Sequence, residues 1–246
     1  MVYILGWYVR DEATEVFHWG MIGNSGKPVI IHWAGTDMLW CALYQLGEPE
    51  KYQKMMEKLN KPQITHWVET PTAGQEVQGL GIKKLEVVAL PPKRVFEASP
   101  LPERFAVSVY YVESPNFIYE PIWAVARDRF DIKFRVHSFL DQRPHLNLPN
   151  VEELGRVLVW ENFLDSVSVA VRFTMHDTWS IGLQEHLLKG RRVVTNQPMP
   201  FAYVSKPEPN HLEAALLDIR NQLLPDQEAS KFYQQRLNHE IFRKKV

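Results

Sequence analysis

The stretch from residue 176 to residue 190 places a carboxylate among apolar neighbours. If a helix begins near Ser180, then Ile181, Glu185 and Leu188 fall on one helical face, at the i, i+4 and i+7 spacing. A buried carboxylate is costly unless hydrogen bonds or an opposite charge compensate it. Glu185 therefore either binds the hydroxyl groups of a ligand or forms a salt bridge at the edge of the apolar face.

Two polar residues precede this helix. Asp177 lies eight residues before Glu185, and Ser180 stands directly before the helical pattern. Both residue types are common at N-cap positions, so capping is the structural alternative to ligand binding. A helix N-terminus also presents free backbone N–H groups, which attract phosphate. The sequence predicts either a simple cap or an anion-binding loop here.

The flanks of this helix predict two parallel strands. Residues 168–171 and 192–195 are apolar runs, and Gly190 between them suits a helix C-cap. In a βαβ unit, the loop after the first strand lies at the carboxyl edge of the sheet, where such folds bind ligands. Arg172 ends the first strand, and it is either a counter-charge for a bound anion or an ordinary surface arginine.

A second polar group lies between His32 and Asp37. It follows a strand expected at 28–33, Gly35 allows a sharp turn, and Thr36 or Asp37 can cap the next helix. A strand-to-helix turn is one interpretation. The other is catalysis, because His32 or Asp37 can accept a proton near neutral pH if its pKa is suitably shifted.

Strands and helices alternate along most of the chain, which predicts parallel sheets covered by helices. Glu69 follows one of these strands and could line the same edge as His32. Residues 147–162 are ambiguous, and four prolines between 91 and 102 suit a linker. We therefore expect domains at 1–92 and 103–225 and a C-terminal helix at 226–246. Strands are expected at 2–5, 28–33, 64–68, 85–90, 105–111, 130–136, 168–171 and 192–195, and helices at 37–46, 49–59, 72–80, 121–129 and 211–223.

Composition narrows the function classes. The 246 residues allow two domains, and the net charge of -1 provides no general attraction for nucleic acids or anionic membranes. The single cysteine, Cys41, excludes an internal disulfide, and the scattered histidines predict no metal site. No apolar window approaches the roughly 18 residues of a membrane span, so we expect a cytoplasmic protein without one.

The segment from Val169 to Asn196 resembles the donor-binding segment of glycosyltransferases with the GT-B fold. Retaining members carry an E-x7-E signature followed by a helix, a glycine and a strand, and here the signature reads Asp177-x7-Glu185. The run from His32 to Asp37 resembles an H-W-x-G-T-D segment of some bacterial members. The resemblance implies an α/β fold with two Rossmann-like domains facing across a cleft and a C-terminal helix that crosses back.

This resemblance also implies roles for individual residues. Glu185 would hold the ribose hydroxyls of a nucleotide-sugar, and Asp177 would lie near the donor sugar. The diphosphate would be bound by backbone N–H groups at the helix start and by a counter-charge, from Thr178, Trp179, Ser180, Ile181 and Arg172. The catalytic candidates are Asp37, His32 and Asp177, and the acceptor-side candidates are Gly35, Thr36 and Glu69.

The implied activity is transfer of a sugar, by default from a UDP-sugar, with retention and without a metal or another cofactor. The acceptor would be a saccharide, a small molecule or a modified nucleobase. The alternatives are a non-catalytic protein of the same fold that binds a nucleotide-sugar or a partner, and an epimerase or phosphorylase.

Three departures from the family pattern matter. Asp177 replaces the first Glu of the signature, and its shorter side chain changes the expected contact with the donor sugar. The first domain is short, so another subunit of a homo-oligomer could complete the acceptor side. The loop after residue 111 has no cation where many members have Arg and Lys. The charge of the diphosphate would then fall on Arg172, on the helix N-terminus, or on Lys133 and Arg135.

Overall fold

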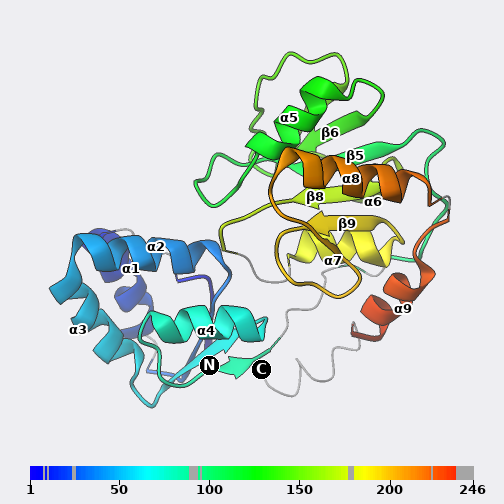
Figure 1. The fold of residues 1–246 in the computed structure, drawn as a ribbon. Coiled ribbons are helices and arrows are strands. Elements are labelled where there is room, and N and C mark those ends of the chain that lie inside the picture. The colour runs from blue at the N-terminus through cyan, green and yellow to red at the C-terminus, as the bar shows by residue number, and fades with distance from the viewer. Residues whose placement is uncertain are drawn as a thin grey trace. The chain divides into compact units, whose positions relative to one another are not determined.

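The computed structural model describes residues 1–7, 9, 11–23, 26–88, 94, 96–176, 180–222 and 224–236. The chain folds into two compact units (Figure 1). The first contains the described residues up to 88 together with His176, and the second contains those from 94 to 175 and from 180 to 236. Each unit is built on a parallel sheet, and none of its described helices is long and apolar enough to span a membrane.

The first unit has a parallel sheet in which the strands follow their order along the chain, β1-β2-β3-β4. The buried side chains of β2 and β3 pack against the helices, with Trp33, Met55 and Leu59 among the least exposed residues of that core. The elements are β1 (Val2–Leu5), α1 (Glu12–Gly23), β2 (Val29–His32), α2 (Thr36–Gly47), α3 (Pro49–Leu59), β3 (Ile64–Val68), α4 (Pro71–Gly79) and β4 (Glu86–Val87).

The second unit has a parallel sheet in the order β10-β9-β8-β5-β6-β7. The buried apolar side chains of β5, β6 and β8 form part of the core of this unit. Its elements are β5 (Ala106–Tyr110), α5 (Glu120–Asp128), β6 (Lys133–His137), β7 (Val151–Gly155), α6 (Trp160–Asp165), β8 (Val169–Arg172), α7 (Ile181–Leu188), β9 (Arg192–Thr195), β10 (Tyr203–Val204), α8 (Pro209–Arg220) and α9 (Gln227–Arg236).

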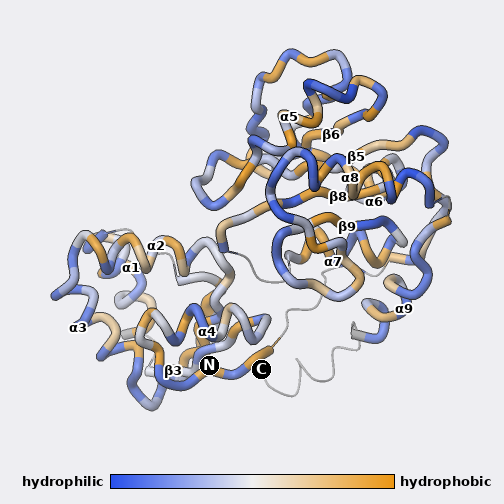
Figure 2. The backbone as a smooth tube through the Cα atoms, in the orientation of Figure 1, coloured by the Kyte–Doolittle hydropathy of each residue, from blue (hydrophilic) through white to orange (hydrophobic). Residues whose placement is uncertain are grey.

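Two helices of the second unit show how the sequence determines helix packing and helix ends. Hydrophobic and hydrophilic residues alternate along α8 (Figure 2), and its apolar side packs on α5 and β9. Helix α7 ends where Gly190 adopts a φ of 75°, and a β-carbon there would lie 2.9 Å from Pro225. Glycine is therefore required at this turn, in agreement with the predicted C-cap.

Several elements differ from the sequence-based prediction. Helix α1 and strand β10 were not expected, and β7 and α6 occupy the segment that was ambiguous. The strand predicted at 85–90 contains only Glu86–Val87 among the described residues. The C-terminal helix begins near the predicted position, and α9 packs on α7 of its own unit. The predicted crossing back would involve residues from 237 onwards, which lie outside the described part of the chain.

Candidate functional site

The second sheet contains a reversal of strand order. Strand β5 lies beside both β6 and β8, so the chain proceeds outwards from β5 in one direction and later returns to its other side. At such a point the loops after the two central strands diverge and leave a crevice at their carboxyl ends. Here these loops follow Tyr110 and Arg172. The carboxyl edge at this reversal is therefore the place where this unit is expected to bind a ligand.

Backbone contacts join the loops that follow β5 and β8. The amide of Ile118 donates to the carbonyl of Phe173 at 3.0 Å, and the amide of Met175 donates to that of Asn116 at 2.8 Å. Phe117 and Thr174 form an isolated antiparallel bridge between the loops. The chain around Arg172 therefore has a defined position.

Arg172 is held over aromatic rings at this point. Its guanidinium carbon lies 4.8 Å from the centre of the Phe117 ring and 5.9 Å from that of Tyr110. A guanidinium over an aromatic face keeps its charge and loses conformational freedom. The structure thus gives this predicted site residue a fixed orientation at the carboxyl edge of β8.

Asn196 clamps the loop that follows Arg172, a contact that the sequence analysis did not anticipate. Its Oδ1 accepts from the amide of Thr174 at 2.9 Å, and its Nδ2 donates to the carbonyl of the same residue at 2.7 Å. Gln197 donates to that carbonyl as well, at 3.2 Å. The hydroxyl of Thr174 is buried and has no hydrogen-bond partner in the described chain. An asparagine directly after a strand was the signal available in the sequence.

The helix that follows this loop begins as predicted. Ser180 is the N-cap residue of α7, and Ile181 is the first helical residue. The Ser180 side chain makes no capping hydrogen bond in the structure as described; the amide of Gln184 instead donates to the Ser180 carbonyl at 3.0 Å. Three further predicted site residues, Asp177, Thr178 and Trp179, lie outside the described residues.

Glu185 is buried, with 7% of its surface exposed, as the predicted inward orientation requires. The reason differs from the predicted single apolar stripe. Helix α7 lies between the sheet and α9, and every residue from Leu183 to Leu188 is buried. Glu185 is therefore buried because the sheet covers one side of α7 and α9 covers the other.

A histidine and aromatic cluster lies beside the crevice and was also not anticipated. The ring of His137, at the end of β6, is 5.0 Å from that of Trp160 and 4.7 Å from that of Phe163, and the His186 ring is 5.6 Å from that of Trp160. Burial, the charge of His186 and the charge of Arg172 lower the pKa of His137 to about 3. Burial lowers the pKa of His186 to about 4. Both imidazoles are neutral at pH 7.

Lys133 and Arg135 do not form the expected cation pair for a diphosphate. Both side chains pair with Glu152 on β7: the Lys133 ammonium lies 2.7 Å from a Glu152 carboxylate oxygen, and Nε of Arg135 lies 3.0 Å from it. Lys133 also stands at the amino end of β6, away from the carboxyl edge. Both side chains are therefore held beside β7 by ion pairs.

In the first unit, Asp37 is completely buried on α2. Its two oxygens accept from the backbone amide of Trp7 at 2.9 Å, that of Ala34 at 3.0 and 3.1 Å, and that of Met38 at 3.0 Å. Burial raises the pKa of Asp37 to about 6, against the opposing effect of these N–H groups. With both oxygens engaged, the side chain ties the start of α2 to the segment after β1, which is the structural interpretation.

His32 ends β2 and is also completely buried. Its Nδ1 lies 2.7 Å from the Tyr3 hydroxyl, and its Nε2 is buried without a partner among the described residues. Burial lowers the pKa of His32 to about 4. Burial and the charge of Glu69 raise the pKa of Tyr3, which places Glu69 near this pair. His32 at the end of β2 and Glu69 after β3 therefore lie near Tyr3, which is within β1.

The remaining acceptor-side candidates form the turn into α2. Gly35 has a φ of 85°, a conformation that favours glycine, and Thr36 begins the helix. Glu69 is followed by Thr70, whose hydroxyl caps α4 by accepting from the amide of Ala73 at 3.0 Å. These turns support the predicted strand-loop-helix order.

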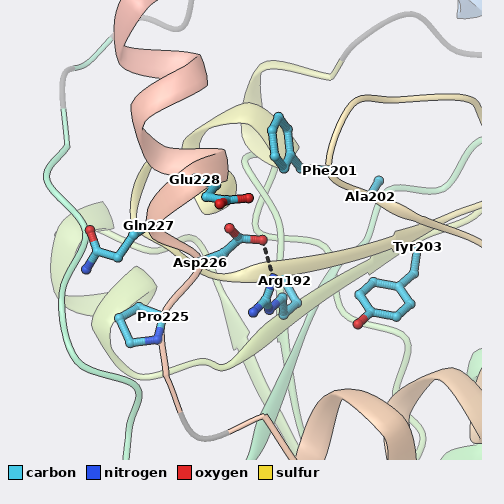
Figure 3. Close-up of a pocket in the computed structure, with 8 residues that line it drawn as sticks. All are labelled: Arg192, Phe201, Ala202, Tyr203, Pro225, Asp226, Gln227 and Glu228. Atoms are coloured by element: carbon cyan, nitrogen blue, oxygen red, sulfur yellow. Dashed lines mark hydrogen bonds and ion pairs between the residues drawn. The ribbon is translucent and has the colours of Figure 1, made fainter.

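A surface pocket of about 570 Å³ lies elsewhere, at the amino end of β9 (Figure 3). An ion pair joins Arg192 to Asp226, and Asp226 also caps α9 by accepting from the amide of Ala229 at 3.0 Å. The pocket contains none of the predicted site residues. Its lining residues are Arg192, Phe201, Ala202, Tyr203, Pro225, Asp226, Gln227 and Glu228.

Comparison with solved structures identifies the fold. HepE from Anabaena, in complex with UDP-glucose, superimposes with a TM-score of 0.72 at 12% identity, over 97% of this chain and 76% of HepE. Sucrose-phosphate synthase from Thermosynechococcus elongatus gives 0.71 at 12% identity, over 99% and 71%. TarM gives 0.66 at 13% identity, over 90% of this chain and 50% of TarM. The chain thus spans half the length of TarM.

No protein-family model matches the sequence, and comparison with curated proteins finds no match. The structural similarity nevertheless covers nearly the whole chain. The chain has the GT-B glycosyltransferase fold, and the predicted α/β class with parallel sheets is confirmed.

Proposed function

We propose that this protein is a glycosyltransferase that moves a sugar from a nucleotide-sugar to an acceptor. The observation that carries the proposal is the reversal between β5 and β8, with Arg172 fixed at its carboxyl edge. The similar fold of HepE, a protein solved with UDP-glucose, makes a UDP-sugar the first donor to test.

The donor would lie with its diphosphate between Arg172 and the start of α7. A helix N-terminus carries roughly half a positive charge, and its N–H groups can bind phosphate oxygens. Arg172 would add a full charge from the other side, with residues 177–179 and Ser180 and Ile181 completing the loop. These fixed charges would stabilise the departing diphosphate without a metal ion.

Glu185 would bind the ribose of the donor. A carboxylate accepts hydrogen bonds from two vicinal hydroxyls, and those bonds would offset the cost of its burial. Asp177 would approach the donor sugar from the loop. We also propose that the sugar is transferred with retention of its anomeric configuration, in line with the Asp177-x7-Glu185 spacing.

On the acceptor side, we assign different tasks to the two candidates. Asp37 has both oxygens engaged by backbone amides, so it would hold the turn that contains Gly35 and Thr36. His32 is neutral and keeps a nitrogen without a partner in the described structure, so it would accept a proton or hydrogen bond from the acceptor. Glu69 would polarise His32 through the hydroxyl of Tyr3.

A panel of nucleotide-sugars tests the activity. UDP-glucose, UDP-N-acetylglucosamine, GDP-mannose and ADP-glucose are incubated with the protein in EDTA, with saccharide acceptors and without them. We expect release of the nucleoside diphosphate from at least one donor, and thermal stabilisation by the same nucleotide. Stabilisation without turnover would indicate a binding protein, and conversion of the sugar without transfer would indicate an epimerase. Activity restored only by Mg²⁺ or Mn²⁺ would contradict the metal-free mechanism.

The position of the ribose has a test of its own. UDP and 2′-deoxy-UDP are titrated into the wild type and into Glu185→Gln. If Glu185 accepts from the ribose hydroxyls, the wild type should prefer UDP by about tenfold, the scale of a charged hydrogen bond, and the variant should lose that preference. An equal preference in both proteins would remove Glu185 from the ribose site.

A further inference from the structure

The pocket at the amino end of β9 is separate from the proposed nucleotide site. Parallel pairing places Arg192 beside Val169 at the amino end of β8, and Thr195 beside Arg172 at the carboxyl end. The two edges are therefore one strand length apart, about 10 Å along the sheet. The pocket volume of about 570 Å³ lies within the range of about 300–1,000 Å³ that small-molecule sites occupy. The pocket can therefore hold a ligand of its own.

Phe201 presents an aromatic ring to this pocket from a strained backbone. Its φ is 63°, in the left-handed region that bulky residues rarely adopt, and 40% of its surface is exposed. Helix α9 fixes the loop from behind: the ring of Phe232 lies 5.2 Å from that of Phe201, and the hydroxyl of Tyr233 donates to the carbonyl of Pro200 at 3.2 Å. Strained residues that the surrounding structure holds in place cluster at binding sites.

The polar side chains of the pocket are only partly engaged within the protein. Arg192 uses Nη1 for its ion pair with Asp226, and its Nε is buried without a partner among the described residues. Asp226 uses its other oxygen to accept from the amide of Ala229. The exposed Glu228 carboxylate forms no ion pair or hydrogen bond with the described chain and lies on the same side of the pocket as Phe201 (Figure 3). A cation with unused donors and a free carboxylate therefore line the same space.

These groups select a ligand that can both donate and accept hydrogen bonds. A guanidinium only donates, and a carboxylate only accepts. An anion without a proton could not donate to Glu228, and an ammonium ion could not accept from Arg192. Hydroxyl groups can do both. The one cation and two carboxylates of the pocket leave a net charge of -1, which also disfavours an anion.

We propose that this pocket binds a neutral saccharide. The apolar C–H face of one sugar ring would lie on Phe201, and the hydroxyls at its edge would bind Arg192 and Glu228. An aromatic ring provides the apolar area for such a contact, and small polyols have no comparable face to cover it. The proposal concerns binding alone, and it holds whether or not the protein transfers sugars.

Saturation-transfer NMR on the full chain tests this site. The probes are maltotriose, cellotriose and triacetylchitotriose, each titrated to about 10 mM with and without saturating UDP. We expect at least one of them to bind with a Kd of about 1 mM or lower, and UDP to leave that Kd unchanged. Glycerol has hydroxyls without the apolar face and should not bind. Glucuronate should bind more weakly than glucose.

Two variants remove the groups that the proposal uses. Phe201→Gly deletes the ring, and glycine suits the left-handed φ, so the protein should stay folded while the affinity for the trisaccharide falls at least about tenfold. Glu228→Gln should weaken binding by about tenfold, the scale of a charged hydrogen bond. Phe130→Ala is the matched control, because Phe130 is a 61% exposed phenylalanine elsewhere in the same unit, and this variant should bind as the wild type does.

Three results would overturn the saccharide site: no binding by any of the trisaccharides, binding that survives both pocket variants, or binding that UDP abolishes. Glucuronate binding more tightly than glucose would assign the pocket to anions and overturn it as well. The affinity for UDP should be unchanged in Phe201→Gly and Glu228→Gln, so a failure of this proposal is distinguishable from a failure of the nucleotide site.

Discussion

The two sheets differ in the order of their strands, and this difference predicts which sheet binds a ligand at its edge. In the first sheet each strand is added beside the previous one, from β1 to β4. In the second, the order reverses between β5 and β8. Sheets of the second kind leave a crevice between diverging loops. Strand order therefore favours the second unit for the proposed nucleotide site.

The polar residues at the two edges fit this division. Both carboxylate oxygens of Asp37 in the first unit accept from backbone amides, so we propose that Asp37 holds the turn. In the second unit, Arg172 is held by aromatic rings, and the hydroxyl of Thr174 is buried without a described partner. The saturated hydrogen bonds of Asp37 favour a structural role for that residue, and the fixed orientation of Arg172 supports the proposed nucleotide site at the second edge.

The largest effect on stability should come from Asp37→Ala. Loss of the carboxylate leaves the amides of Trp7 and Ala34 without their acceptor, while that of Met38 keeps the carbonyl of Gly35, so unfolding should require about 3–5 kcal/mol less free energy. Denaturant titration measures the change. Asp11→Ala is the control, because the exposed Asp11 caps one amide, that of Thr14 at 2.9 Å, and should cost about 1 kcal/mol. A stable Asp37→Ala protein with lost transfer would restore Asp37 as the catalytic base.

Arg172→Ala should weaken nucleotide binding without unfolding the protein. Removal of a charged contact to the diphosphate costs about 1.5–3 kcal/mol, which is roughly a ten- to hundredfold loss of UDP affinity. Titration calorimetry measures the loss. Arg135→Met is the control, because Arg135 lies on β6 of the same sheet and its charge pairs with Glu152. Equal losses in both variants would indicate a general electrostatic effect and argue against the crevice.

Acid should destabilise the protein through its buried histidines. Burial lowers the folded-state pKa of His32 and His186 to about 4 and that of His137 to about 3, so below pH 6.5 protons bind the unfolded chain first. Stability from these groups is present above pH 6.5 and is lost as the pH falls towards 4. Asp37 acts in the opposite direction, because its pKa is raised to about 6.

The contribution of one histidine can be isolated with His186→Gln. Each fully titrating group changes stability by at most about 1.4 kcal/mol per pH unit. The variant should therefore show a shallower fall of melting temperature between pH 6.5 and pH 4.5 than the wild type. Parallel curves for the two proteins would show that His186 is not held neutral in the folded state.

The smallest effect is expected from Thr174→Val. The hydroxyl of Thr174 has no partner in the described structure, so its removal should leave the melting temperature unchanged within about 0.5 kcal/mol of stability. Thr195→Val is the control, because the Thr195 hydroxyl accepts from the amide of Gln197 at 3.2 Å. If Thr174→Val lowers UDP affinity and leaves stability unchanged, the hydroxyl belongs to the ligand site.

Local patterns predicted most elements of both units; β7, α6 and β10 in the second unit and α1 in the first were not predicted. Strand β8, helix α7 and Gly190 are local patterns, and a βαβ unit follows from them. Helix α1 was missed because its apolar residues surround the helix, with Phe17 outside and Trp19 inside, which gives no clear apolar face. A helix that carries apolar residues on its exposed face as well lacks the single apolar face by which an amphipathic helix is predicted.

The candidate site was predictable only where strand ends define it. Arg172 and Ser180 follow from a strand and a helix start, and both occupy the predicted positions. Asn196 and His137 could not be joined to them, because their contacts depend on which strands lie side by side. The pairing of Lys133 with Glu152 likewise depends on β6 lying beside β7.

The central claim is that the nucleotide binds at the reversal of the second sheet. Hydrogen–deuterium exchange with and without UDP tests it most directly, because bound ligand slows exchange where it restricts local opening. We predict slower exchange, by about fivefold or more at saturating UDP, in peptides covering residues 110–119 and 172–188, and unchanged exchange in peptides covering residues 29–44. Protection confined to residues 29–44, with none near Arg172, would contradict this account.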